Sequence, residues 1–191
     1  MVSRLLFILT ALIVFISCRS EKTRSIHFPQ FGWTLPLPHD MKFEDSAFDR
    51  NGIIRDSMWE REIVRKQPRA ELFQIRADRD NYCAIVVYED SSDLTTWKKG
   101  IISDSREFYF DLIAGMPDTR IIDSSLSDVK LDNAEFLQEY INYKKKRNDM
   151  IFSYQFSRRY KKYAMYINIR YTDKKIGKRY LKMIKNSEFE S

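Results

Sequence analysis

Cysteine is scarce in this chain of 191 residues, which contains only Cys18 and Cys83. A disulfide framework of the kind that holds small secreted domains together is therefore excluded. The five glycines form no phosphate-binding loop. No Cys-x-x-Cys, His-x-x-x-His or EF-hand spacing occurs. We accordingly expect no metal and no cofactor.

Histidine is equally rare, since only His27 and His39 are present and neither follows or precedes an obvious nucleophile. A Gly-x-Ser-x-Gly elbow is also missing. The sequence therefore assigns no catalytic residue and favours a protein that is not an enzyme. One alternative stays open. Glu89, Asp90 and Asp93 could supply the acid and base of an exported hydrolase acting on glycan or peptide, although acids so placed also form turns and helix caps.

Apolar runs of membrane-spanning length are absent, and the most apolar stretch, residues 5–16, follows Arg4 at the start of the chain. A helix of about 12 residues is roughly 18 Å long, too short for a hydrocarbon core of about 30 Å. The stretch ends in Ser17-Cys18 and resembles the lipobox of bacterial lipoprotein signals, which implies cleavage before Cys18 and acylation of its sulfur. An ordinary secretory signal is the alternative.

The expected organisation follows from this leader. Residues 1–17 form a cleaved signal peptide, residues 18–30 carry the lipidated cysteine and a polar tether, and residues 31–191 form one domain. That length is sufficient for a single core without metals or disulfides.

The charge balance is mildly basic, with a net charge of +6. Acidic residues occur throughout the sequence, so we expect no nucleic-acid binding. Basic residues concentrate at residues 144–147, at residues 158–162 and along the last predicted helix. If they converge, Arg158, Arg159, Lys161 and Lys162 form a patch suited to anionic lipid, lipopolysaccharide or an acidic protein. The alternative is a set of solvated loop charges.

Alternating and β-branched residues predict strands. Residues 72–77 and 82–89 flank a turn-forming segment and predict a hairpin. Residues 120–129 and 136–143 are expected to be extended. Residues 150–157 and 163–171 alternate with period two and predict a second hairpin with one buried face. Cys83 lies in an apolar strand, where a free cysteine usually behaves as a small buried side chain.

Capping residues predict helices between and after the strands. Asp93 can cap a short helix that carries Trp97, and Asp104 can begin a second helix that stops at Gly115. Asp173 can cap the last helix, whose apolar residues form one stripe. The class is therefore α+β, with a mainly antiparallel sheet covered by helices. Trp33, Trp59 and Trp97 are expected to be core anchors rather than sugar-stacking platforms.

The order of motifs and predicted elements along the chain resembles that of a known family. The chain opens with Trp33-Thr34-Leu35-Pro36-Leu37-Pro38, continues with a helix near Trp97, and finishes with a tyrosine-rich strand pair, a helix and Asn186-Ser187-Glu188-Phe189. These residues resemble the Mog/PsbP-like superfamily over about residues 31–189. The resemblance implies an α/β/α sandwich used mostly for docking to other proteins. It transfers no functional residue to this sequence.

Together these features predict a lipid-anchored bacterial cell-envelope protein that acts as a non-enzymatic interaction or accessory module. Its partners would be the membrane, through the lipid on Cys18, and an envelope protein or anionic surface. Arg19 follows the cysteine where an Asp would signal retention at the inner membrane, so the prediction places the protein at the outer membrane.

Replacing Cys18 by Ala tests the anchor. The C18A chain should stay unacylated and uncleaved by the lipoprotein peptidase, and should no longer be extracted with lipid-modified proteins into detergent. Mass spectrometry of the N-terminal peptide and cell fractionation measure both effects. A C18A chain that is cleaved and released like the wild type would instead indicate an ordinary secretory signal.

Overall fold

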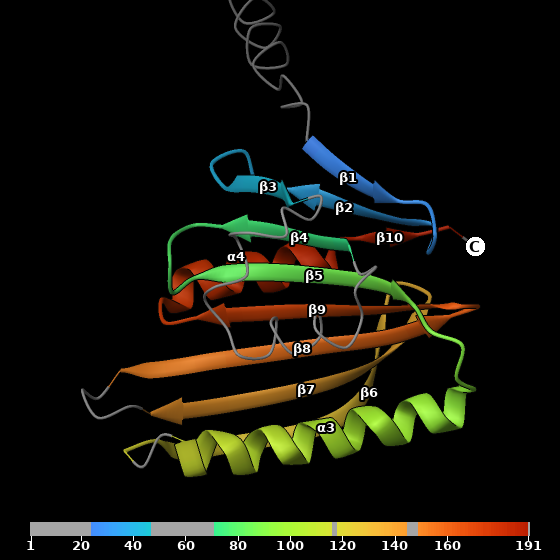
Figure 1. Ribbon diagram of the computed structural model, residues 1–191. Coiled ribbons are helices and arrows are strands. Elements are labelled where there is room, and N and C mark those ends of the chain that lie inside the picture. Colours follow the sequence, from blue (N-terminus) through green and yellow to red (C-terminus); the bar gives the residue numbers. More distant parts are fainter. Residues whose placement is uncertain (1–23, 47–70, 116–117, 145–148, 191) are drawn as a thin grey trace, which may run out of the picture.

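A computed structural model describes residues 24–46, 71–115, 118–144 and 149–190. These residues form two antiparallel sheets and two helices (Figure 1). The predicted α+β class, with a mainly antiparallel sheet covered by helices, is confirmed. Among the helices of these segments, none combines the length and the apolar character needed to cross a membrane.

The larger sheet has seven strands in the order β3-β4-β5-β9-β8-β7-β6. Strands adjacent in sequence pair throughout, except at the centre, where β5 pairs with β9 and Ile85 lies opposite Ile167. The strands are β3 (Lys42–Ser46), β4 (Glu71–Arg76), β5 (Tyr82–Glu89), β6 (Arg120–Leu131), β7 (Ala134–Lys144), β8 (Met150–Tyr160) and β9 (Tyr163–Tyr171).

A smaller sheet and two helices complete the layers. The smaller sheet has the order β1-β2-β10, built from β1 (Arg24–Phe28), β2 (Trp33–Leu37) and β10 (Glu188–Phe189). Helix α4 (Lys174–Lys185) packs against β9 and β2, on the rear face of the larger sheet in Figure 1. Helix α3 (Leu94–Gly115) lies at the front and contacts β8. The arrangement is therefore an α/β/α sandwich, as the resemblance implied.

Helix α4 is fixed at its start and along its buried face. Asp173 caps it by accepting hydrogen bonds from the backbone N–H groups of Lys175 and Ile176. The buried Tyr180 hydroxyl accepts from the Ala77 N–H at 2.9 Å and donates to the carbonyl of Asn81 at 2.9 Å. The helix therefore reaches across the sheet to the turn between β4 and β5.

Asn81 connects the same turn to the helix cap. Its side-chain oxygen accepts from the N–H groups of Thr172 and Asp173, and its amide group donates to the Asp78 carboxylate. Both the oxygen and the NH2 group of this buried amide thus have hydrogen-bond partners. Such a network stabilises one arrangement of the chain, because breaking it leaves several polar groups without partners.

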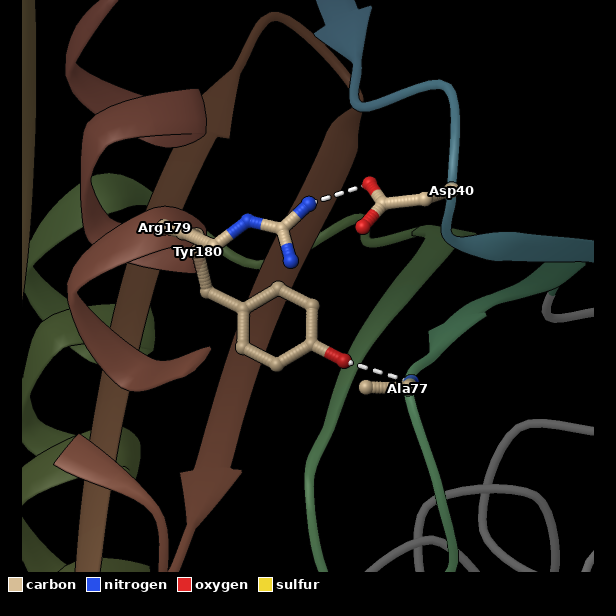
Figure 2. Close-up of polar contacts among 4 residues, drawn as sticks. All are labelled: Asp40, Ala77, Arg179 and Tyr180. Atoms are coloured by element: carbon tan, nitrogen blue, oxygen red, sulfur yellow. Dashed lines mark hydrogen bonds and ion pairs between the residues drawn. The ribbon is translucent and has the colours of Figure 1, made fainter. Parts of the chain in front are cut away.

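Figure 2 shows the neighbouring polar contacts of α4. Tyr180 points to Ala77, while Arg179 on the adjacent position pairs with Asp40 in the turn after β2. The hydrogen bond from Arg179 holds the pKa of Asp40 below its usual value. Both groups are solvent-exposed, so this ion pair contributes little to stability.

The core on the α4 side is aromatic and aliphatic. Trp33 is fully buried and stacks on Phe28 and Phe189, with ring centroids 4.8 Å and 5.7 Å away. Cys83 lies in the same core, as predicted, and burial raises the pKa of its thiol. Aromatic pairs of this geometry contribute beyond the area they bury, by about 0.5–1.5 kcal/mol each.

The core on the α3 side forms around Trp97 and Ile101, which pack against β5 and β9. Tyr88 and Tyr166 stack there with centroids 5.6 Å apart and their hydroxyls 2.8 Å apart. Burial raises the pKa of Tyr88 to about 12 and raises that of Tyr166 further. The predicted hairpin with one buried face is therefore wrong for β9, which is buried on both faces because α3 covers the second one.

Two further expectations need correction. The tether predicted for residues 18–30 is too long, because Arg24–Phe28 forms β1, pairs with β2 and buries Phe28. The two helices predicted from Asp93 and Asp104 are one helix, α3. Asp93 caps it through Thr96, as expected, but no proline interrupts it near Asp104 and the internal Gly100 costs only about 1 kcal/mol.

Two glycines in the two helices provide a matched test of the packing. A Cβ at Gly177 would lie 2.4 Å from the Tyr171 ring, whereas a Cβ at Gly100 would have no neighbour within 4 Å. We expect G177A to lower the free energy of unfolding by about 1–3 kcal/mol through overpacking. We expect G100A to raise it by about 0.5–1 kcal/mol. Urea denaturation of the mature, unacylated chain measures both, and equal effects of the two variants would contradict the α4 packing.

The buried tyrosines predict alkaline unfolding. Since the pKa of Tyr88 is raised in the folded state, its contribution is complete below the ordinary tyrosine pKa of about 10. It is lost as the pH rises toward about 12. Y88F should therefore show a shallower loss of stability between these pH values than Y160F, which alters an exposed tyrosine. Denaturation at several pH values and tyrosinate absorbance measure this, and identical slopes would contradict it.

Candidate functional site: the β8–β9 turn

The predicted basic patch falls on the turn between β8 and β9, at the right-hand end of the sheet in Figure 1. Tyr160 and Tyr163 form the last pair of the hairpin, and Lys161 and Lys162 make the turn. Lys161 has a φ of 54°, a left-handed conformation that is uncommon for residues other than glycine, asparagine and aspartate. Two-residue hairpin turns require such a conformation, and Asp132 adopts it in the turn between β6 and β7.

Arg158 lies among aromatic rings on the α4 side of the sheet. Its guanidinium carbon is 4.6 Å from the ring centroid of Phe189, 5.2 Å from Tyr160 and 5.6 Å from Phe136. The side chain is half-buried, and its buried Nη1 atom has no hydrogen-bond partner. None of the ion pairs in the described residues includes Arg158, and burial lowers its pKa. In the part of the chain that the structure describes, this cation is thus held by ring faces and has no carboxylate partner.

Lys161 and Tyr160 extend this arrangement to the surface. The Lys161 ammonium lies 5.0 Å from the Tyr160 ring centroid, and Tyr160 is exposed. Phe31, from the turn between β1 and β2, lies 6.5 Å from the Tyr160 ring. We call Phe31, Arg158, Tyr160, Lys161 and Phe189 the turn cluster.

The other two predicted residues do not join the turn cluster. Arg159 points to the opposite face of the sheet, as neighbours on a strand do, and donates to the Asp90 carbonyl at 3.3 Å. Lys162 pairs with Glu89 at 2.7 Å, and the hydrogen bond from this pair raises the lysine pKa. Lys162 is therefore paired with a carboxylate, and Arg159, which has one hydrogen bond and a buried Nε without a partner, lies on the face away from the turn cluster.

The other basic residues discussed above lie elsewhere where the structure describes them. Helix α4 begins at the opposite end of the sheet, as Figure 1 shows, and carries the exposed Lys178 there. Arg179 is paired with Asp40. Cys18, Trp59 and residues 145–147 lie outside the described residues.

Comparisons with known proteins address the fold. No family model and no curated protein matches this sequence. A solved structure does: the solution structure of cyanobacterial PsbP (CyanoP) from Synechocystis sp. PCC 6803 is similar with a TM-score of 0.54 and 11% sequence identity. The match covers 87% of this chain and 92% of that chain. The fold is PsbP-like.

The carboxylates of the alternative hydrolase hypothesis have structural roles in this PsbP-like domain. Glu89 pairs with Lys162, and Asp90 accepts hydrogen bonds from the N–H and the hydroxyl of Ser92. Asp93 caps α3, and the hydrogen bonds from Thr96 lower its pKa. A general acid needs a raised carboxyl pKa, so Asp93 is poorly suited to that role.

The two histidines lie at different places in the fold. The His27 ring lies 3.1 Å from the Thr34 hydroxyl across the β1–β2 pair, and His39 lies in the turn after β2. No group of three His, Cys, Asp or Glu side chains suitable for a metal occurs in the segments that the structure covers. Trp33 and Trp97 are buried, as predicted for core anchors.

Sequence reasoning missed three of the rings that lie around Arg158 and Tyr160. Phe31, Phe136 and Phe189 come from the β1–β2 turn, β7 and β10, far from residue 158 in the chain. The alternation along β8 does carry one signal, since Arg158 follows Phe152, Tyr154 and Phe156 on the same face. An arginine at an apolar position of a strand is the pattern that could have identified it.

Proposed function

We propose that this protein is a lipid-anchored accessory module of the bacterial cell envelope, without enzymatic activity, whose turn cluster binds an anionic membrane surface. The acyl chains on Cys18 hold it at the bilayer, and the PsbP-like domain adds a second, electrostatic contact. Placement at the outer membrane remains part of this proposal.

The observation that carries the proposal is the state of Arg158. Its guanidinium is half-buried, has an unpaired buried nitrogen and faces three rings instead of a carboxylate. Cation–π contacts return about 0.5–2 kcal/mol, less than full hydration or a carboxylate partner would supply. An incoming phosphate would provide the missing acceptor, because arginine matches phosphate geometry with paired N–H donors.

The neighbouring residues suit a lipid surface. Tyr160 combines an exposed ring with a hydroxyl, and tyrosines of this kind favour the headgroup region of a bilayer. Lys161 adds a cation beside it, and each basic residue near an anionic membrane contributes about 1 kcal/mol. The turn cluster thus offers both an apolar and a charged contact.

The proposed anchor keeps this contact within reach. At full extension the chain between Cys18 and Arg24 spans about 20 Å, so the domain would stay close to the bilayer. The acyl chains would provide the attachment, and the electrostatic contact would add to it. The effective concentration of lipid headgroups at the turn cluster is correspondingly high.

The match to CyanoP, at 11% identity, concerns the fold alone. The hydrolase alternative has no comparable support, because each of its carboxylates is bound in a turn, an ion pair or a helix cap. We therefore do not propose an enzymatic activity.

Vesicle binding tests the electrostatic contact. The mature chain with Cys18 changed to Ser should bind vesicles of mixed phosphatidylcholine and phosphatidylglycerol, and should not bind phosphatidylcholine alone. R158Q combined with K161E should weaken this binding by about tenfold or more. Binding should also vanish in about 1 M salt, where the screening length is about 3 Å.

The matched control combines K175E with K178Q on α4, at the other end of the sheet. It changes the net charge by the same amount, so it should bind nearly as well as the unmodified chain. Equal losses in the two double variants would contradict a localised site and indicate a general charge effect. No vesicle binding at low salt would contradict the proposal outright.

A further inference from the structure

A second surface lies away from the turn cluster, on the α4 side of strands β6, β7 and β8. Ser125, Tyr140 and Tyr154 form one row across these strands, because Ser125 pairs with Tyr140 and Tyr140 pairs with Tyr154. The two tyrosine rings lie 4.6 Å apart with an interplanar angle of 39°. The row therefore presents two adjoining phenol rings beside a hydroxyl.

Polar side chains border Tyr140 on both sides, whereas Phe152 and Phe156 border Tyr154 on the same face. The register places Asp123 opposite Asn142 in one neighbouring row, and Ser127 opposite Gln138 in the other. All these positions share the face of Tyr140, since residues two apart on a strand point the same way. The result is a pair of rings with two amides, a carboxylate and hydroxyl groups on the β6 and β7 side, and with aromatic rings on the β8 and β9 side.

This surface is open to solvent. Asp123, Ser125 and Ser127 are exposed, and Tyr140 and Tyr154 are half-buried. Helix α4 packs on β9 and β2 instead, and Figure 1 shows β6 turning away behind the other strands.

The Tyr154 ring is also held in place from the side. Tyr154 stacks on Tyr171 at 6.4 Å with an interplanar angle of 9°, and Tyr171 stacks on Phe152 at 5.0 Å. The close contact of Tyr171 with Gly177 fixes that stack against α4. A rigid aromatic platform loses little side-chain entropy when a ligand covers it.

The chemistry of the surface selects its ligand class. Asp123 is the one charged residue in these three rows. A surface with a single carboxylate does not attract phosphate or other anions. A sugar ring has an apolar C–H face, which packs on an aromatic ring, and hydroxyl edges, which bond to amides and carboxylates. Ring faces bordered by short polar side chains match both properties.

We propose that this surface, defined by Asp123, Ser125, Gln138, Tyr140, Asn142 and Tyr154, binds a neutral glycan chain. With strands about 4.8 Å apart and alternate residues about 6.7 Å apart, it is large enough for about two sugar rings. The site is independent of the turn cluster, so a failure of membrane binding would leave it unaffected.

Calorimetric titration of the mature, unacylated chain with cellohexaose and chitohexaose tests the site. At least one of these neutral oligosaccharides should bind, and Y140A should weaken that binding by about tenfold or more. Y140F should remain within about threefold of the wild type, because the ring is retained. The R158Q and K161E double variant should bind the sugar normally, which separates this site from the turn cluster.

Melting curves followed by circular dichroism show whether each variant is folded. Y160A is the matched control, because it removes a tyrosine at the β8–β9 turn. A folded Y140A chain that binds the sugar as well as the wild type would overturn the proposal. So would a wild-type chain that binds neither oligosaccharide, or a Y160A chain that loses binding as fully as Y140A does.

Discussion

The pairing of β5 with β9 is the constraint on which the rest of the structure depends. It joins residues 82–89 to residues 163–171 at the centre of the larger sheet. Both strands are buried almost throughout, on both faces. A sheet centre of this kind is stable only when each face is covered, and the two helical layers provide that cover. The bonds of Asn81 and Tyr180 then join the cap of α4 to the end of the same strand pair.

This arrangement decides which cations are available for binding. The register of β9 with β8 places Arg158 opposite Met165 and Arg159 opposite Ala164, and thus on opposite faces of the sheet. Arg159 meets the linker after β5, while Arg158 meets the rings brought by β7 and β10. A turn that looks uniformly basic in sequence is therefore divided by the pleat of the strand. The same pleat exposes the tyrosine row of β7 and β8 on the α4 side, beyond the area that the helix covers.

Local chemistry predicted much of this fold. Alternation in residues 150–171 is strong because one face of each strand is apolar, and Asp173 caps the last helix as its side chain suggests. The weaker expectations failed where tertiary contacts decide. A short strand such as β1 is polar in composition and exists because β2 supplies its hydrogen bonds and Phe28 reaches the core. Residues 94–115 form one helix, and β9 is buried on both faces, because of packing between distant segments. The periodicity of a single segment gives no information on such packing. The turn cluster likewise draws Phe31 and Phe189 from the two ends of the domain.

Amide hydrogen exchange of the acylated protein on anionic vesicles tests the central claim most directly, because it reports where the domain meets the membrane. The account predicts added protection at residues 30–32 and 158–163 relative to the same protein in neutral vesicles, with α4 unchanged. Protection that falls on α4 instead, or no difference between the two vesicle types, would contradict it.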